Sequence, residues 1–253
     1  MFHGLAGHLR IEETARQQLF EIGGEHVGTR RKRTEPIARH FDRKADCCAV
    51  DATPEAPAKL IRVSRLMLEA LAGAGLDGSS VLDLGCGQGP FSLAVLEHGA
   101  GRVTGIDLSP LAIEVARARA AAAGLGDRAR FLVGDAAAED ALPHDVVVLN
   151  RVICCYPDVD DLLRTSLAAT GRVYGVILPA SSGPWGLLSR IALGFENLLR
   201  VVRRDPFRAY VHPVERVDDA ANAAGLVALR RNRHRIWRLA VYTRPSGAAG
   251  TPA

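Results

Sequence analysis

The chain has 253 residues, of which 48% are hydrophobic and 24% charged, as expected for a globular protein with one buried core. Its formal net charge of +4 is too small to indicate a general nucleic-acid-binding protein. It has no run of 18 apolar residues, no signal-peptide pattern and only five cysteines, so we expect a cytoplasmic protein without stable membrane insertion or a disulfide framework.

Residues 1–54 have mixed polarity and predict an N-terminal extension with a helix near Glu12–Glu21. Apolar residues between Glu55 and Ala72 recur at helical spacing, which predicts a second helix. From Val81 onward, short apolar runs alternate with helical patterns. The strands expected are Val81–Leu84, Val103–Ile106, Arg130–Val133, Asp145–Leu149 and Arg172–Leu178. The helices expected between them are Phe91–Glu97, Leu111–Ala123 and Asp158–Ala169.

An insertion at residues 184–212 interrupts this alternation. Its apolar residues from Trp185 to Val202 recur at helical spacing and predict an amphipathic helix of about five turns. The last elements expected are a helix, Val214–Ala224, and two strands near Leu226–Arg231 and Arg235–Thr243, with Asn232 near the turn. Residues 245–253 are rich in glycine, alanine and proline and are expected to be disordered.

Strands that alternate with helices predict an α/β fold with a doubly wound parallel sheet, to which the closing hairpin adds one antiparallel strand. Ligands of such sheets bind beyond the carboxyl ends of the strands. The loops that follow Asp83, Asp107, Val133 and Leu149 are therefore the places to look for a site.

The first of these loops is Asp83-Leu84-Gly85-Cys86-Gly87-Gln88-Gly89, in which glycines tolerate positive φ and let the backbone approach a ligand. Dinucleotide sites share such a stretch, but their fingerprint places the third glycine one position later. Asp107 ends the second strand, where a carboxylate can accept hydrogen bonds from both hydroxyls of a ribose. Asp135 follows the third strand, where it could face an adenine amine. The alternative is that Asp107 and Asp135 only cap helices.

Together these three loops resemble the motifs of class I S-adenosylmethionine (AdoMet)-dependent methyltransferases, over roughly residues 55–243. The resemblance implies a Rossmann-like sandwich with a seven-stranded, mostly parallel sheet of order 3-2-1-4-5-7-6, in a catalytic domain of residues 55–244. It implies AdoMet as cofactor and S-adenosylhomocysteine as product. The methionine end would lie at the glycine loop, the ribose at Asp107 and the adenine at Asp135. The cofactor-binding residues implied are Asp83, Gly85, Cys86, Gly87, Asp107, Leu108, Asp135, Ala136, Asn150 and Arg151.

A narrower resemblance begins at residues 40–45 and 151–158, which look like the branch that includes magnesium-protoporphyrin O-methyltransferases. In that branch the N-terminal residues form a helical lid over AdoMet, which assigns this role to residues 1–54. The porphyrin enzymes carry a Tyr in the lid and a His before the Tyr-Pro pair, whereas this chain has His40 and Cys155 there, so methylation of a porphyrin carboxyl is not expected.

Three residues are candidates for the acceptor side of the site. His40 could act as a general base or a hydrogen-bond donor, Tyr156 could orient the acceptor, and His212 lies in the insertion. The alternatives are an exposed lid histidine and a packing tyrosine. Cys154 and Cys155 are expected to be small buried residues, and because adjacent cysteines chelate poorly, neither this pair nor Cys47-Cys48 predicts a metal site.

The insertion is expected to act as a substrate lid whose apolar stripe lines the acceptor pocket, with Arg200, Arg203, Arg204 and Arg208 as a cationic rim. The alternative is a helix packed on the sheet edge. The function expected is SN2 methyl transfer to a small-molecule acceptor with an apolar body and an anionic group. Cyclisation or other non-methylating chemistry on AdoMet, and a non-catalytic binding protein, are the other possibilities, and a homodimer is a further expectation.

Overall fold

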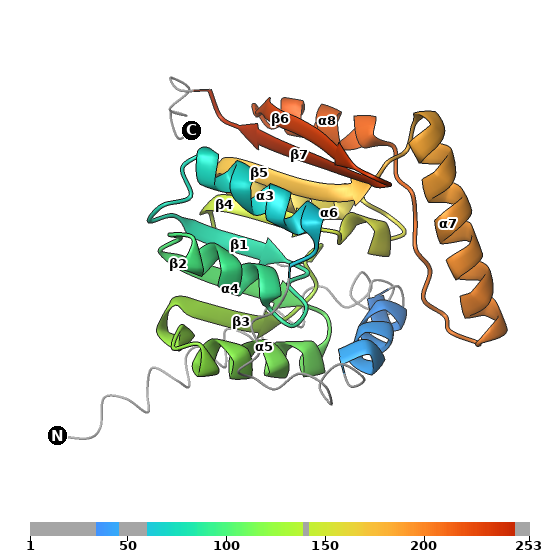
Figure 1. Cartoon of the computed structure of the whole chain (residues 1–253), viewed down its shortest axis with the longest axis horizontal. Helices are drawn as coiled ribbons and strands as arrows, with labels where there is room; N and C mark the ends of the chain where they lie inside the picture. The colour runs from blue at the N-terminus through green and yellow to red at the C-terminus, as the bar shows by residue number, and fades with distance from the viewer. Residues whose placement is uncertain (1–33, 46–59, 139–141, 246–253) are drawn as a thin grey trace, which may run out of the picture.

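The computed structural model describes residues 34–45, 60–138 and 142–245. Seven strands form one sheet in the order β3-β2-β1-β4-β5-β7-β6, which confirms the predicted fold class (Figure 1). The first five strands pair in parallel, and β7 runs antiparallel between β5 and β6. The strands are β1 (Ser80–Leu84), β2 (Arg102–Asp107), β3 (Ala129–Val133), β4 (His144–Asn150), β5 (Thr170–Pro179), β6 (Val227–His234) and β7 (Trp237–Thr243).

Helices cover both faces of this sheet (Figure 1). One face carries α3 (Arg62–Gly73), α4 (Pro90–Glu97) and α5 (Pro110–Ala122). The other face carries α6 (Asp160–Ala168) and α8 (Val214–Ala223). A further helix, α7 (Gly183–Val202), stands at one side of the sandwich, and residues 34–45 form another helix beside the sheet, between α5 and α7 (Figure 1).

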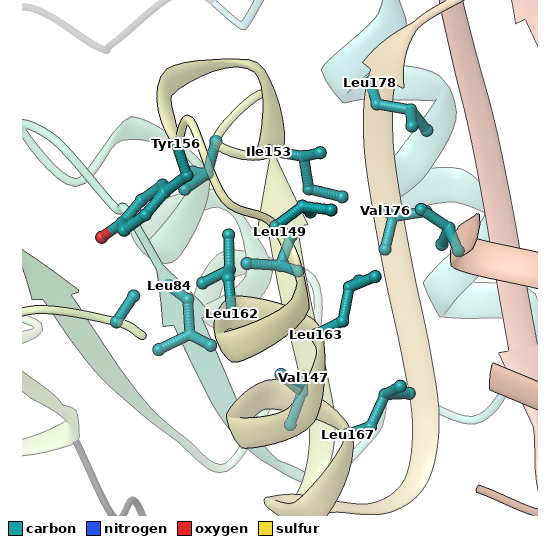
Figure 2. Close-up of a cluster of buried hydrophobic side chains, with 14 of the residues drawn as sticks. Leu84, Val147, Leu149, Ile153, Tyr156, Leu162, Leu163, Leu167, Val176 and Leu178 are labelled. Carbon is teal, nitrogen blue, oxygen red and sulfur yellow. The ribbon is translucent and has the colours of Figure 1, made fainter. Parts of the chain in front are cut away.

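The central strand β4 shows why an unbroken apolar run forms a buried strand. Val147 and Leu149 point into the core under α6, whereas Val146 and Val148 belong to the core on the opposite face. Alternate residues of a strand face opposite sides, so a strand covered by helices on both faces needs apolar residues at every position. Figure 2 shows Leu162, Leu163 and Leu167 of α6 packed against this face of β4 and β5.

Local sequence sets the start of α5, whose first turn borders the ligand edge of the sheet. The Ser109 hydroxyl caps the helix by accepting a hydrogen bond from the Ala112 N–H at 3.0 Å, and Pro110 occupies the first helical position. The predicted helix therefore begins where its cap and proline place it.

Two predictions about the C-terminal part are wrong. The hairpin turns at Arg235–Ile236 and not near Asn232, because Leu239 and Val241 of β7 pack into the core and so set the register of β6 on β7. The apolar stripe of α7 does not face the interior: Leu187, Ile191 and Phe195 are 60%, 59% and 61% exposed, and only Gly186 and Ser189 of this helix are buried.

Candidate active site

A cavity of about 530 Å³ lies at the carboxyl ends of β1, β2 and β4, where a doubly wound sheet binds its ligands. Nearly all of the predicted cofactor residues line it, namely Asp83, Gly85, Cys86, Gly87, Asp107, Leu108, Ala136, Asn150 and Arg151. The 34–45 helix and α7 add His40, Phe41, Ala192, Leu193, Glu196 and Arg200 to the lining. Asp135 and His212 are not part of the lining, although both neighbours of Asp135 are.

The glycine loop has the left-handed backbone that the sequence predicts, with φ of 72° at Gly85 and 55° at Gly87. A Cβ on Gly85 would lie 2.2 Å from Val152 Cγ2, so only glycine lets the loop pack against the segment after β4. A Cβ on Gly87 would meet nothing within 4 Å, and this glycine borders the cavity. The loop thus exposes its backbone to whatever the cavity holds.

Asp83 lies under this loop and is 1% exposed. Its Oδ2 accepts a hydrogen bond from the Ser92 hydroxyl at 2.6 Å, whereas Oδ1 has no partner among the described residues. Burial raises the pKa of Asp83 to about 7, against the hydrogen bond from Ser92 and with a smaller contribution from the charge of Asp107. A buried carboxylate oxygen without a donor is costly, which favours a ligand that brings a cation or an N–H group to it.

Asp107 connects the glycine loop to the next strand. Its Oδ2 accepts a hydrogen bond from the Gly87 N–H at 2.8 Å, and its Oδ1 accepts one from the Ser109 N–H at 2.9 Å. Burial raises the pKa of this carboxyl above its ordinary value, and the two backbone hydrogen bonds oppose that shift. Each oxygen keeps a second lone pair, so Asp107 can hold the loop and accept hydrogen bonds from a ligand together.

Asp135 carries the third carboxylate. Its Oδ1 accepts hydrogen bonds from the Ala137 N–H at 2.9 Å and the Tyr156 hydroxyl at 2.8 Å, whereas Oδ2 is buried without a partner in the described part of the chain. Burial, and then the charge of Asp135, raise the pKa of Tyr156 well above its ordinary value. The hydroxyl of Tyr156 therefore positions this carboxylate, a contact that the prediction of an acceptor-orienting tyrosine did not foresee.

His212 also contacts the segment that follows β4. Its Nε2 lies 2.8 Å from the Tyr156 carbonyl oxygen, and burial lowers the pKa of the imidazole. Because His212 does not line the cavity, its predicted place on the acceptor side has no support in the geometry. It braces the segment after β4 instead.

Asn150 and Arg151 stand where β4 ends, as the sequence predicts. The Asn150 side-chain oxygen accepts a hydrogen bond from the Ser64 hydroxyl of α3 at 3.1 Å. Arg151 has a φ of 64°, which is unusual for a residue with a side chain, and its guanidinium lies 5.3 Å from the centroid of the Trp237 ring. Functional sites often hold a residue in such a backbone conformation, and here it turns the chain at the cavity wall.

The 34–45 helix is held over the cavity at two places. The Asp42 carboxylate accepts a hydrogen bond from the Ser109 hydroxyl at 2.5 Å, which ties it to the start of α5. On the other side, His40 Nδ1 and an Arg43 guanidinium nitrogen lie 2.8 Å and 3.0 Å from Asp205 Oδ2, after the end of α7. This helix therefore bridges two parts of the fold across the site.

Asp205 and its neighbour Phe207 are residues that the sequence did not single out. The His40 ring stacks on Phe207 with centroids 4.3 Å apart, so one imidazole nitrogen faces Asp205 and the ring face is covered. The only local signal at this turn is an acid between arginines and a proline, Arg203-Arg204-Asp205-Pro206. The contact itself joins residues 165 positions apart.

The predicted cationic rim is wrong in its detail. Arg200 lines the cavity and pairs with Glu196 at 2.9 Å. Arg203 and Arg204 are exposed and lie outside the lining, and Arg208 donates its hydrogen bonds to the backbone carbonyls of Asp205 and Phe207. The wall that α7 contributes to the cavity is thus partly polar and not the apolar stripe of the helix.

Three of the five cysteines lie within the described residues. Cys86, Cys154 and Cys155 are free, buried and next to the cavity. Burial raises the pKa of the Cys86 thiol well above its ordinary value, which keeps this thiol protonated and unreactive. Cys47 and Cys48 lie outside the described residues, within which no group of three or more histidine, cysteine or acidic side chains could hold a metal ion.

The residues present fit AdoMet. Two buried carboxylate oxygens, Asp83 Oδ1 and Asp135 Oδ2, have no partner within the described ranges and belong to the first and third of the predicted loops. Asp107 lies on the strand between them and keeps lone pairs for a ligand. AdoMet has an ammonium group, a ribose diol and an adenine amine, which are the donors that such carboxylates need.

Comparison with known proteins agrees with this geometry. Residues 81–171 match the family model described as a methyltransferase domain. The ribosomal protein L11 methyltransferase of Actinobacillus succinogenes is 42% identical over 103 residues, 39% of this chain and 35% of that protein. The release factor glutamine methyltransferase of Rhodospirillum rubrum is 36% identical over 135 residues, 50% of this chain and 39% of that protein. The chain thus matches less than half the length of these relatives.

Among solved structures, magnesium protoporphyrin IX methyltransferase from Synechocystis PCC 6803 with bound S-adenosylhomocysteine has a TM-score of 0.59 and 18% identity, and the match covers 83% of this chain and 98% of that one. At this identity the likeness establishes the fold. The fold and the family match together confirm the predicted class I AdoMet-dependent methyltransferase domain.

One prediction is overturned by these comparisons. The curated relatives are named for proteins as their substrates, ribosomal protein L11 and a release factor, so they contradict the expectation of a small-molecule acceptor. The apolar residues that motivated it are largely the stripe of α7, which points away from the cavity. No described helix is long and apolar enough to cross a membrane.

Proposed function

Because this chain carries a class I AdoMet-dependent methyltransferase domain, we propose that it binds AdoMet in the cavity at the strand ends and transfers the methyl group to an acceptor. One observation supports this most: three adjacent strands each place a carboxylate at or just beyond their carboxyl ends, and two of these carboxylates keep a buried oxygen without a partner in the described part of the chain.

Each carboxylate has a separate task in this proposal. Asp83 Oδ1 accepts a hydrogen bond from the ammonium group at the methionine end, Asp107 accepts those of the ribose hydroxyls, and Asp135 Oδ2 accepts that of the adenine amine. Asp83 is protonated in about half of the molecules near pH 7, because burial raises its pKa to about 7. A cation at Oδ1 favours the ionised form, so binding should release a proton in this pH range.

On the acceptor side, His40 is the group that we assign as general base. AdoMet supplies a methyl group on a sulfonium, which is electrophilic without further activation. Asp205 engages His40 Nδ1, which leaves Nε2 as the nitrogen that can take the proton of an acceptor O–H or N–H as the acceptor attacks. The stacked Phe207 keeps the ring in this orientation. The acceptor would gain the methyl group, and the electron pair of the broken carbon–sulfur bond would stay on the sulfur of the product S-adenosylhomocysteine.

Cofactor binding is tested by titration calorimetry with AdoMet. Asp107→Asn should lower the affinity at least about tenfold, because a charged acceptor of ribose hydroxyls is lost. Asp127→Asn, an exposed acid outside the cavity, is the matched control and should bind as the wild type does. Equal affinities for the two variants would contradict the assignment of the ribose site.

Turnover is tested by incubating the protein with methyl-labelled AdoMet and a cell extract. Label in a product together with S-adenosylhomocysteine supports methyl transfer. AdoMet consumed without S-adenosylhomocysteine would assign other chemistry to the same cavity. Binding without consumption in every extract tried would point to a binding protein and against the proposal.

A further inference from the structure

Helix α7 has its apolar side on the outside. We define its outer face as Leu187, Leu188, Ile191, Phe195, Leu198, Leu199 and Val202, which are all 37% to 74% exposed. They recur at intervals of one, three and four residues and therefore form one continuous stripe along the whole helix. Figure 1 shows α7 at the margin of the molecule, with one side facing away from the sheet. Monomeric proteins seldom leave an apolar stripe of this length in water.

Two polar residues of α7, Ser189 and Asn197, face the rest of the fold. The Ser189 hydroxyl donates a hydrogen bond to the Trp185 carbonyl oxygen and lies 3.4 Å from the Ile236 carbonyl oxygen. The Asn197 side chain donates one hydrogen bond to the backbone of Ala209 and accepts another from it. Glu196 and Arg200 line the cavity and pair with each other. The usual arrangement of an amphipathic surface helix is thus reversed, so burial in the core does not explain the outer face.

Cationic groups lie at both ends of the outer face. At the N-terminal end, the Arg233 guanidinium lies 5.3 Å from the Trp185 ring centroid, and Arg190 is exposed one turn further along. At the C-terminal end, Arg203 and Arg204 are exposed. The acids of this region, Glu196 and Asp205, are already paired with Arg200 and with His40 and Arg43.

This charge pattern distinguishes between the possible occupants of the outer face. If two copies paired through α7 in opposite directions, the arginines at the C-terminal end of one helix would meet Arg190 and Arg233 of the other. If they paired in the same direction, like ends would meet. Either arrangement brings together cations that have no acidic partner among the described residues, which is unfavourable. An anionic surface neutralises both ends at once.

We propose that α7 lies flat on an anionic membrane surface, with its outer face among the acyl chains and its terminal arginines among the lipid headgroups. A helix with a full apolar face and flanking arginines binds in the plane of a bilayer, and this requires no membrane-spanning helix. The opposite side of the same helix lines the cavity, so docking leaves the cavity wall in place. The proposal does not depend on methyl transfer.

The test is flotation of the full chain with vesicles of equal parts phosphatidylglycerol and phosphatidylcholine, compared with phosphatidylcholine alone. The wild type should float with the anionic vesicles and be released by high salt, because screening weakens its contacts with headgroups. The double variant Phe195→Glu/Leu198→Glu should reduce the bound fraction at least about tenfold. Leu142→Glu is the matched control, since Leu142 is 80% exposed and lies before the amino end of β4, whereas α7 follows the carboxyl end of β5.

The outcomes are distinct. Binding lost only in the α7 variant, with unchanged circular dichroism, supports the proposal. No flotation of the wild type, equal binding to neutral vesicles, or equal loss in the Leu142→Glu control would overturn it. A wild-type dimer in analytical ultracentrifugation that the α7 variant converts to a monomer, without any vesicle binding, would assign the outer face to a second copy and overturn it as well.

Discussion

Asp83 offers the clearest test of how the cofactor site is built. Its buried carboxyl, when ionised, destabilises the protein without AdoMet, and a bound ligand should relieve this destabilisation. The side chain is 1% exposed, and burial raises its pKa from 3.8 to about 7. Between these values the native chain holds a proton that the unfolded chain has lost. The contribution of Asp83 to the free energy of unfolding therefore falls as the pH rises from about 4 to about 7 and is constant above that range.

Asp83→Asn removes this dependence. From pH 5 to pH 8 the wild type should lose about 2 to 3 kcal/mol of unfolding free energy that the variant keeps, a value that follows from the shifted pKa and about 1.4 kcal/mol per unit. The amide also leaves an N–H near the site without a partner, which costs about 1 to 3 kcal/mol, but this cost is the same at every pH. Only the part of the difference in unfolding free energy that changes with pH reports the ionisation of the Asp83 carboxyl.

Urea unfolding of both proteins without AdoMet, at several pH values from 5 to 8, measures this difference. Other carboxyls titrate in both proteins and cancel in the comparison. Parallel stability curves would refute the account of Asp83 as a buried carboxyl with a raised pKa. AdoMet affinity of the variant should fall, because the ammonium group loses a charged acceptor. A stability of the variant relative to the wild type that rises with pH, together with a loss of affinity, separates a ligand-binding residue from a structural one.

Three further changes test the rest of the site. Tyr156→Phe should weaken AdoMet binding about threefold to tenfold in calorimetry, since Asp135 loses a hydrogen bond of 2.8 Å; an unchanged Kd would remove the tyrosine from the adenine end. Gly85→Ala should cost about 2 to 4 kcal/mol in urea unfolding, because its Cβ would lie 2.2 Å from Val152; a loss below about 1 kcal/mol would contradict this packing. Asp205→Asn should lower kcat about tenfold with the KM for AdoMet unchanged, whereas a change in KM alone would limit this acid to docking the N-terminal helix.

The cofactor end of the site was predictable from local sequence. Gly85 and Gly87 must adopt positive φ, and Asp107 ends a strand whose apolar run is visible in the sequence. Such features depend on residues within a few positions of one another, and parallel strands bring their carboxyl ends to one edge whatever lies elsewhere in the chain. The loops therefore implied a shared site before any contact between them was known.

The acceptor end depended on contacts that no local pattern contains. His40 was a candidate from the sequence, but its partner Asp205 lies 165 residues away. Tyr156 was expected to face an acceptor, whereas its hydroxyl reaches the Asp135 carboxylate from a loop after another strand. These pairings arise only when the sheet and the helices over it bring distant segments together.

Helix α7 shows most clearly which features local sequence determines and which depend on tertiary contacts. The spacing of its apolar residues determined that they share one face of a helix about five turns long. Which way that face points depends on what the opposite face can contact, and here Ser189 and Asn197 find polar partners outside the helix, at Ile236 and Ala209. The sequence determined the stripe, and the tertiary structure turned it outward because the polar side of the helix is the one whose hydrogen bonds the rest of the fold satisfies.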